Sequence, residues 1–393
     1  MKESQAKGRR IRLKYLAHVE MGQSPPSSGY GNSPSDGLPF LQGTADFGAQ
    51  TPEPRVFCST PAKVATAGLI LFSVRAPVGE LNIADQDYGI GRGLCSVQGG
   101  RSLNNRFAWW GLHEAKNQLA WVATGSTYEA VSAEEVSNIG ICHPSNQEQR
   151  TIADYLDRET ARLDALVAAK ERLLELLAEK RRALITRAVT RGLNPDAPLR
   201  SSGIPWLGEI PAHWEVKQLK WAITFQRGHD LPADDREEGS VPIVTSCGVS
   251  GTHARAMARG PGIVTGRYGT IGQFYLVAED YWPLNTTLYS INLRANDPRF
   301  LQYMLIHLSP LFLLNAVKSA VPGVDRNDIH SIATAVPPLP EQHGIVAHVA
   351  SETAKLDALR SAAEPTIGLL KERRAALIAA AVTGQLDSLA LVS

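Results

Sequence analysis

The sequence PSNQEQRTIADYLDRETARLDALV at residues 144–167, whose segment continues to EKRRALITRAVTRGL at 179–193, occurs a second time in the chain. The second copy begins PPLPEQHGIVAHVASETAKLDALR at 337–360 and ends KERRAALIAAAVTGQL at 371–386. Glu148 corresponds to Glu341, an offset of 193 residues that holds without a gap, and about half of the paired positions are identical. An internal duplication therefore organises the chain.

Both copies predict a long helix. In the first copy, Leu163, Val167, Leu174 and Leu177 belong to an apolar stripe with a period near 3.5, and further leucines widen it beyond a two-stranded seam. Either helix alone is typical of a generic helical bundle. Two such helices, each following an unlike mixed region, favour an intramolecular antiparallel pair that acts as a spacer. The first helix would span roughly 50 Å at ~1.5 Å per residue.

Local signals also predict where these helices end. Gly192 and Gly384 follow the two apolar stripes and are typical helix stops. Pro365 lies inside the second copy, and we expect it to bend or interrupt that helix because proline lacks a backbone N–H donor.

The regions between the helices, residues 1–143 and 201–336, are rich in Gly, Pro, Thr and short β-branched runs, which predicts mixed α/β lobes with many turns. They are weakly alike: Leu13-Lys14-Tyr15 resembles Leu219-Lys220-Trp221, Gly68 to Ser73 with Gly79 resembles Gly262 to Gly266 with Gly272, and Arg106-Phe107 returns as Arg299-Phe300. The whole chain is thus interpreted as a tandem duplication with diverged lobes.

The predicted architecture is α+β, with two mixed α/β domains separated by two long antiparallel helices that form a coiled-coil spacer, related by a pseudo-twofold internal repeat. The predicted segments are a first lobe at 1–143, a helical spacer and linker at 144–200, a second lobe at 201–336 and a second helical spacer at 337–393.

Composition limits the possible functions. The 393 residues are 44% hydrophobic and 20% charged, with no apolar run of the ~20 residues that a bilayer-spanning helix needs. The four cysteines are scattered without a CxxC pair, which fits a reducing cytoplasm better than a disulfide framework or zinc site. The net charge is only +1, so a DNA-binding role requires either clustered basic groups or partners that share the phosphate contacts.

Motifs for catalysis are missing from the sequence. It has no GxxxxGK[ST] phosphate loop, HExxH zinc motif, GxSxG elbow or GxGxxG after a strand. The [DNS]PP[YFW] tetrapeptide of amino-methyltransferases and a PD…(D/E)xK nuclease cluster are also missing. We therefore predict no catalytic residue and no metal ligand, and a recognition protein is favoured over an enzyme.

Several loop-like stretches carry side chains suited to reading base edges, since Arg pairs bidentately with guanine and Asn or Gln with adenine. In the first lobe the candidates are Gln23, Arg75, Arg92, Arg101, Asn104 and Asn105. In the second lobe they are Arg227, His229, His253, Arg255, Arg259, Arg267, Tyr268, Asn285 and Thr286. For any one of these residues taken alone, a solvated surface position is the favoured interpretation. Trp109, Trp110, Tyr303 and Leu305 are interpreted instead as core residues of a helix in each lobe.

Three elements together resemble the specificity subunits of type I restriction–modification systems. They are the repeated P-x-x-x-E-Q-x-x-I…L-D-A-L segment, the stretch SGIPWLGEIPAHWEV at 202–216, and ILFSVRAPVG at 70–79 followed by GRG at 91–93. The second helix departs from the first, with Pro365 and Gly368 where the first has Arg172 and Glu175.

The resemblance implies two target-recognition domains that each read half of a split DNA site, on helices that set the gap and dock two modification subunits. Those adenine methyltransferase partners would bind S-adenosylmethionine, and restriction motor–nuclease subunits would use ATP and Mg²⁺, so no cofactor is expected in this chain. Two other classes stay open: a single-chain nuclease or methyltransferase, for which both lobes would leave no room, and a scaffold whose lobes bind peptide or glycan. Binding of duplex DNA in the presence of partners separates the first class from the scaffold.

Overall fold

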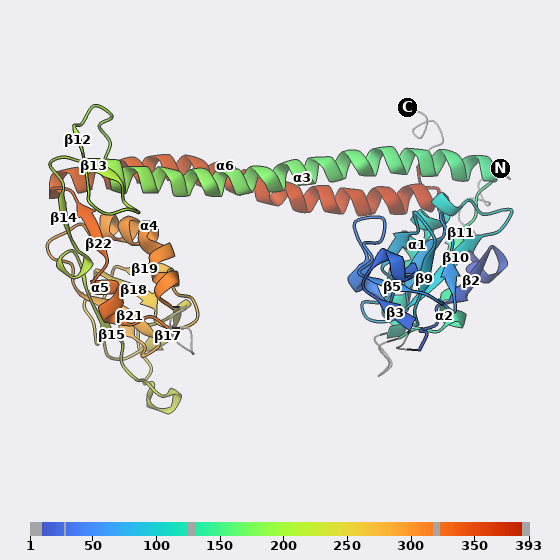
Figure 1. Ribbon diagram of the computed structural model, residues 1–393, viewed down its shortest axis with the longest axis horizontal. Coiled ribbons are helices and arrows are strands. Elements are labelled where there is room, and N and C mark those ends of the chain that lie inside the picture. The colour runs from blue at the N-terminus through green and yellow to red at the C-terminus, as the bar shows by residue number, and fades with distance from the viewer. Residues whose placement is uncertain (1–9, 27–28, 124–129, 317–322, 387–393) are drawn as a thin grey trace. The chain divides into compact units, whose positions relative to one another are not determined.

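The structure is a computed structural model that describes residues 10–26, 29–123, 130–316 and 323–386. The chain folds into two compact units. Unit 1 comprises Met1–Lys170 and Pro365–Ser393, and unit 2 comprises Glu171–Glu364. Both boundaries fall inside long helices, so each unit contains one mixed α/β lobe and one segment of each long helix (Figure 1).

Unit 1 builds its lobe from short strands and two helices. The strands are β1 (Arg10–Arg12), β2 (Ala17–Met21), β3 (Tyr30–Gly31), β4 (Leu38–Leu41), β5 (Val56–Cys58), β6 (Val64–Ala65), β7 (Ile70–Ser73), β8 (Leu81–Ile83), β9 (Tyr88–Ile90), β10 (Leu94–Gly99) and β11 (Gly140–Cys142). The helices are α1 (Asn105–Ala123) and α2 (Ala133–Ser137). An antiparallel sheet has the order β2-β10-β7-β8, and a second sheet has the order β3-β5-β4-β9-β6.

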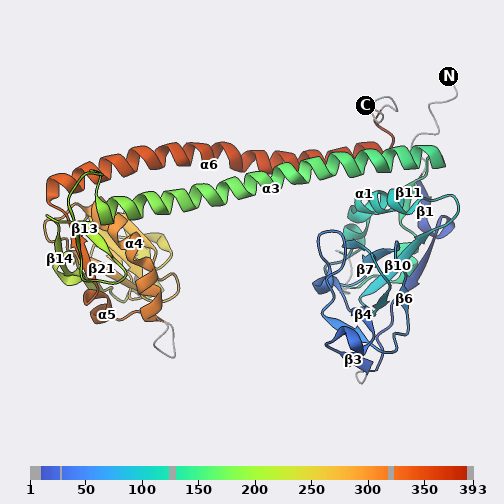
Figure 2. The ribbon, with the colours of Figure 1, turned by 45° about the horizontal axis from the view of Figure 1, so that its top comes forward.

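The main core of unit 1 lies between the four-stranded sheet and α1 (Figure 2). Phe72 of β7 and Val97 of β10 belong to the same buried cluster as Phe107 and Trp110 of α1. Burying each such side chain contributes about 1.5–3 kcal/mol. Trp109 and Trp110 are buried, which confirms their prediction as core residues.

Unit 2 repeats this plan. Its strands are β12 (Leu199–Ser201), β13 (Glu209–Pro211), β14 (Glu215–Gln218), β15 (Thr224–Arg227), β16 (Val241–Thr245), β17 (Gly248–His253), β18 (Gly262–Gly266), β19 (Phe274–Val277), β20 (Trp282–Pro283), β21 (Thr287–Asn292) and β22 (Ala333–Val336). Its helices are α4 (Pro298–Ala316) and α5 (Arg326–His330). The antiparallel sheet β15-β21-β18-β19 packs against α4, where Tyr303 and Leu305 are buried as predicted.

Hydrogen-bond registers show that both lobes have the same frame. Ser73 of β7 lies opposite Leu94 of β10, and Gly266 of β18 lies opposite Thr287 of β21, so both strands keep the offset of 193 residues. At the start of the lobes, the N–H of Leu13 donates to Ile139 and that of Leu219 to Ile332, so the first strands are offset by 206. The two offsets differ by 13, so between equivalent positions of these strands unit 1 has 13 more residues than unit 2. The predicted internal repeat is confirmed.

The two long helices are α3 (Asn146–Arg191) and α6 (Leu339–Val382). The Ser145 hydroxyl and the Glu148 carboxylate form reciprocal hydrogen bonds with backbone N–H groups at the start of α3, which is a capping box. Gly192 and Gly384 adopt φ values of +69° and +73° just beyond the helix ends, as predicted. The expected interruption at Pro365 was wrong, because α6 is one helical element through this residue.

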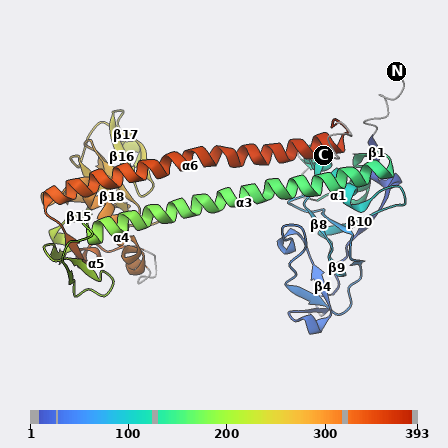
Figure 3. The same ribbon diagram turned by 90° about the horizontal axis from the view of Figure 1, so that it is seen from above.

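Within each unit the two helix segments run antiparallel (Figure 3). In unit 1, Asp164 of α3 pairs with Arg374 of α6 at 2.9 Å. In unit 2, Arg181 of α3 pairs with Asp357 of α6. These are the same contact in the two repeats, since each residue has its counterpart 193 positions away. Such exposed pairs contribute about 0–1 kcal/mol, so they mark the register of the helices more than they stabilise it.

Candidate nucleic-acid interface

Three of the first-lobe candidates gather at one edge of the unit 1 sheet. Because the sheet is antiparallel, β2 and β7 end where β10 and β8 begin. Gln23, Arg92 and Arg75 occupy the turns at this place, which we call the β7–β8 edge. Hydrogen bonds join the turns: the N–H of Gln23 donates to Ile90 O at 2.9 Å and that of Val74 to Gly93 O at 2.9 Å.

The side chains at the β7–β8 edge are available for a ligand. Gln23, Arg75 and Arg92 are all exposed. Within the part of the chain that the structure describes, their side chains make no hydrogen bond or ion pair. The edge therefore presents two guanidinium groups and one amide to solvent, which are donors and acceptors suited to base edges and phosphates.

The other three first-lobe candidates lie at the opposite edge of this sheet, after β10. Arg101 is exposed in the turn between β10 and α1. The Asn104 Oδ1 accepts hydrogen bonds from the N–H groups of Arg106 and Phe107, at 2.9 and 3.2 Å, and so caps α1. Asn105 accepts from the Gly99 N–H at 2.7 Å. The two asparagines thus have structural roles, and their contact with DNA stays a prediction.

Unit 2 gathers six candidates at the matching edge of its sheet, which we call the β18–β19 edge. The residues are Arg227 at the end of β15 and His229 after it, Arg267 and Tyr268 after β18, and Asn285 and Thr286 before β21. The N–H of Arg267 donates to Thr286 O at 2.8 Å, and that of His229 donates to Pro283 O at 2.8 Å. The turns are therefore joined as they are in unit 1.

Internal contacts orient the side chains of the β18–β19 edge. Asn285 donates from Nδ2 to an oxygen of Asp230, and the His229 Nε2 lies 3.1 Å from the Tyr289 hydroxyl. The Arg267 guanidinium lies over the Tyr268 ring, 4.9 Å from its centroid. Contacts of this kind restrict rotamers before a ligand binds, which lowers the entropy cost of binding.

The remaining second-lobe candidates are placed elsewhere. His253 ends β17 and is only 4% exposed, and its Nδ1 accepts a hydrogen bond from the Glu237 N–H at 3.0 Å. In this conformation its ring is not presented to solvent. Arg255 pairs with Glu237 at 3.6 Å, and Arg259 precedes the start of β18. Both arginines are exposed, but they lie away from the β18–β19 edge, and their DNA contacts stay predictions.

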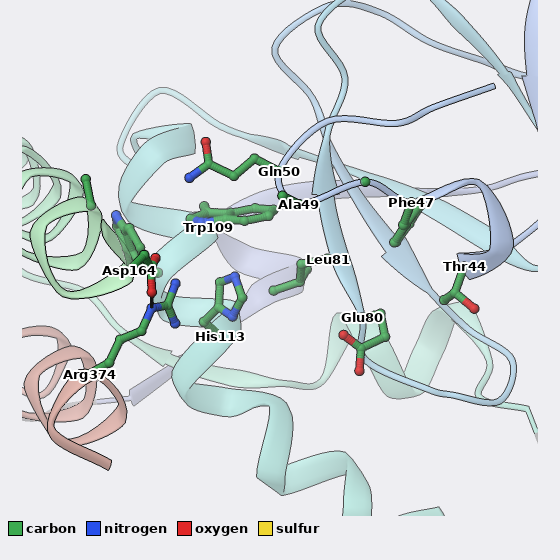
Figure 4. A pocket seen from close by; sticks show the side chains of 13 residues that line it. Thr44, Phe47, Ala49, Gln50, Glu80, Leu81, Trp109, His113, Asp164 and Arg374 are labelled. Atoms are coloured by element: carbon green, nitrogen blue, oxygen red, sulfur yellow. Dashed lines mark hydrogen bonds and ion pairs between the residues drawn. The ribbon is translucent and has the colours of Figure 1, made fainter. Parts of the chain in front are cut away.

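Unit 1 also contains a cavity of about 650 Å³ that the sequence did not indicate. Figure 4 shows Trp109 and His113 of α1 facing it, with Asp164 of α3, Arg374 of α6 and the 44–50 loop on its other sides. Burial lowers the pKa of His113 to about 4, and the positive charges of Arg374 and Lys116 act in the same direction. The imidazole is therefore neutral at physiological pH. In the sequence, the only sign of this cavity was that His113 follows Trp109 by one helical turn, and that spacing also fits ordinary core packing.

Two further features concern metal binding and membrane spanning. Among the residues with described positions, no group of three or more His, Cys, Asp or Glu side chains is placed to hold a metal ion. No helix in the same ranges combines the length and apolarity needed to cross a lipid bilayer.

Comparison with protein families gives a direct match. Residues 12–176 match the model of the type I restriction modification DNA specificity domain. The chain is 35% identical over 167 residues to a protein of Methanocaldococcus jannaschii provisionally named the type I restriction enzyme MjaX specificity subunit, and this match covers 40% of the chain but only 39% of that protein. It is 22% identical over 362 residues to the type I restriction enzyme EcoDI specificity subunit of Escherichia coli, covering 83% of the chain and 78% of the relative.

Solved structures share the fold. A chain from a structure concerned with complex assembly and conformational transition of a type I R-M system superposes with a TM-score of 0.76 at 18% identity, covering 96% of this chain and 98% of the other. The HsdS subunit from Thermoanaerobacter tengcongensis gives a TM-score of 0.54 at 17% identity and covers 97% of each chain.

The fold defines a tandem-repeat protein in which each mixed α/β lobe is joined to segments of two long helices. The family match and the named relatives make the assignment specific. Residues 12–176 match the type I restriction modification DNA specificity domain, and the chain is similar over most of its length to a named type I specificity subunit.

Proposed function

We propose that this chain is the non-catalytic DNA-recognition subunit of a type I restriction–modification complex, in which each unit reads one half of a bipartite site. The observation that carries the proposal is the pair of matched sheet edges. In both units, candidate base-reading side chains lie on turns at the same place in the fold, although the side chains differ. Two differing readers on one frame are suited to a split site with two unlike halves.

We also propose that α3 and α6 set the gap between the half-sites and dock two modification subunits. Each helix continues from one unit into the other without a break in its helical assignment. Exposed leucines occur as matched pairs: Leu166 and Leu369 belong to unit 1, and their counterparts Leu359 and Leu176 belong to unit 2. Exposed apolar groups on a helix are typical of a protein–protein contact, and two equivalent pairs suit two copies of one partner.

The partners would supply what this chain lacks. Modification subunits would bind S-adenosylmethionine and methylate adenine, and restriction motor–nuclease subunits would use ATP and Mg²⁺, in the cytoplasm. A net charge of +1 fits this division, because the partners would share the phosphate contacts with the specificity subunit.

Mapping of adenine methylation tests the proposal. The chain is co-expressed with its modification subunit, and methylated positions are read across the host genome by single-molecule sequencing. We expect two short sequence blocks separated by a fixed run of unspecified bases. Exchange of residues 201–336 for those of a related subunit should change one block only. If the complex assembles and binds S-adenosylmethionine but methylates nothing, the proposal fails and a scaffold that binds peptide or glycan is favoured.

A further inference from the structure

The β7–β8 and β18–β19 edges share one backbone frame. The N–H of Val74 donates to Gly93 O, and the N–H of Arg267, its counterpart 193 positions later, donates to Thr286 O. The carbonyl groups of the same two residues accept from Val131 at 2.8 Å and from Val324 at 3.0 Å, which are again counterparts.

A close backbone approach repeats as well. A Cβ built on Gly22 would lie 2.2 Å from the Gly91 oxygen, and one built on Gly228 would lie 2.1 Å from the Leu284 oxygen. Only glycine fits at these two positions, so the backbone turns in the same way after β2 as it does after β15. Side chains placed on the two edges therefore start from equivalent backbone positions.

The side chains on this shared frame differ between the units. The positions correspond as Gln23 with His229, Arg75 with Tyr268, and Arg92 with Asn285. Tyr268 and the three residues of unit 1 are exposed, whereas His229 and Asn285 are half-buried. The opposite edge differs less, because Arg101 corresponds to Arg294, and Asp297 caps α4 as Asn104 caps α1. The turns at this edge therefore have the same backbone frame in both units but carry side chains of different chemistry.

We infer that these three pairs of positions decide which bases each unit reads, an inference that rests on the proposed function. Unit 1 presents two arginines and a glutamine, which favour a half-site that depends on guanine at two positions. Unit 2 presents no arginine at the same three positions but a histidine, a tyrosine and an asparagine, whose amide pairs with adenine. At these three positions, therefore, unit 1 offers two guanine readers and unit 2 offers none. The two arginines found elsewhere on the β18–β19 edge have internal partners, since Arg227 lies 3.9 Å from Asp230 and Arg267 lies over the Tyr268 ring.

The experiment is a transplant of the three side chains in the complete complex with the modification subunit. Gln23→His, Arg75→Tyr and Arg92→Asn are combined, and the preferred sequence is read both from genomic methylation and from selection of the complex on a randomised duplex library. We expect the guanine preference of one block to fall about tenfold or more, since each bidentate pair contributes about that factor. The other block stays unchanged. The control is Gln98→Ala, an exposed residue toward the opposite end of β10 that is not among the candidates, which should leave both blocks intact.

Each result decides the inference. An unchanged pair of blocks in the triple variant overturns it, and so does a loss of both blocks in a complex that assembles and unfolds at the wild-type temperature. If the triple variant does not fold, Arg92→Asn alone is used, and a half-site unchanged by this replacement overturns the inference. A different outcome is a wild-type complex that neither methylates nor selects a split sequence, because this result contradicts the proposed function itself.

Discussion

At the scale of single residues, one buried glutamine in each unit joins the lobe to the start of a long helix. The Gln149 Oε1 accepts from the Asn104 N–H at 2.8 Å, and its Nε2 donates to Ser102 O and Pro144 O. Gln342 makes two equivalent bonds in unit 2, accepting from the Asp297 N–H at 2.9 Å and donating to Pro337 O at 2.9 Å, while its other donated bond goes to Asn296 Oδ1 at 2.8 Å. Both side chains are almost completely buried. The E-Q of the repeated motif thus fixes where the first turn of each helix meets its lobe.

Replacement of this amide should destabilise unit 1. Gln149→Ala removes three part-buried hydrogen bonds, although Ser102 O keeps His143 Nε2 as a neighbour at 2.9 Å, and we expect a loss of about 1–3 kcal/mol in the free energy of unfolding. Urea unfolding followed by tryptophan fluorescence measures it. Gln147→Ala, two residues earlier at an exposed position of α3, is the matched control and should change little. Equal effects of the two variants would contradict the role of Gln149.

The buried His113 makes the stability of unit 1 depend on pH. Its pKa is about 4 in the folded chain and 6.5 ordinarily, so between these values the unfolded chain binds a proton that the folded chain does not. Stability is therefore complete above pH 6.5 and is lost as the pH falls toward 4, by about 3 kcal/mol at most.

His113→Gln should reduce this dependence. We expect the variant to lose less stability than the wild type between about pH 7.5 and about pH 5, measured by urea unfolding at both values. Identical losses in the two proteins would show that other groups carry the acid sensitivity.

At the scale of elements, the long helices were predictable and the sheet edges were not. The helical spacing of Leu163, Val167 and Leu174 is a local signal, and the duplication makes the same signal occur twice in the sequence. In contrast, the grouping of Arg75 with Arg92 depends on the register of β7 against β10, which is a non-local pairing. Asn104 was grouped with them by residue type, yet the chain folds it to the opposite edge, where it caps α1.

Pro365 shows why local rules fail in a packed helix. It removes one backbone hydrogen bond, but α6 is held in buried clusters on both sides, through Ile345 and Val349 before it and Ile378 and Val382 after it. This packing outweighs the cost of one proline, so the helix continues.

Removal of the proline should therefore stabilise the chain. Pro365→Ala restores a donor and a strong helix former, and we expect a gain of up to about 3 kcal/mol. Arg172→Pro, at the corresponding position of α3, is the reciprocal variant and should cost a similar amount. Thermal unfolding followed by circular dichroism compares them. A lower midpoint for Pro365→Ala would mean that the proline has a favourable role in α6.

At the scale of the whole molecule, duplication gives both units the same set of exposed features. Each unit carries one sheet edge with candidate residues and one pair of exposed leucines, which under the proposed function are its surfaces for DNA and for a partner. The composition predicted that partners share the phosphate contacts, but it gave no indication of where they dock. The leucine pairs emerge only when α3 and α6 lie side by side within a unit.

The leucine pairs predict the stoichiometry of the complex. Leu166→Glu with Leu369→Glu places two charges on the partner surface of unit 1, and we expect one modification subunit to be lost while the second stays bound. Leu359→Glu with Leu176→Glu should remove the other, and all four changes should remove both, as measured by light scattering after gel filtration. These leucines are 45–62% exposed, so the variants should fold. Full binding by the quadruple variant would place the docking surface elsewhere. Arg172 and Glu175, which form an ion pair at 2.7 Å, precede Leu176, whereas the uncharged Pro365 and Gly368 precede Leu369. The two surfaces therefore differ in charged groups at equal net charge, and the wild-type chain should bind its two partners with unequal dissociation constants.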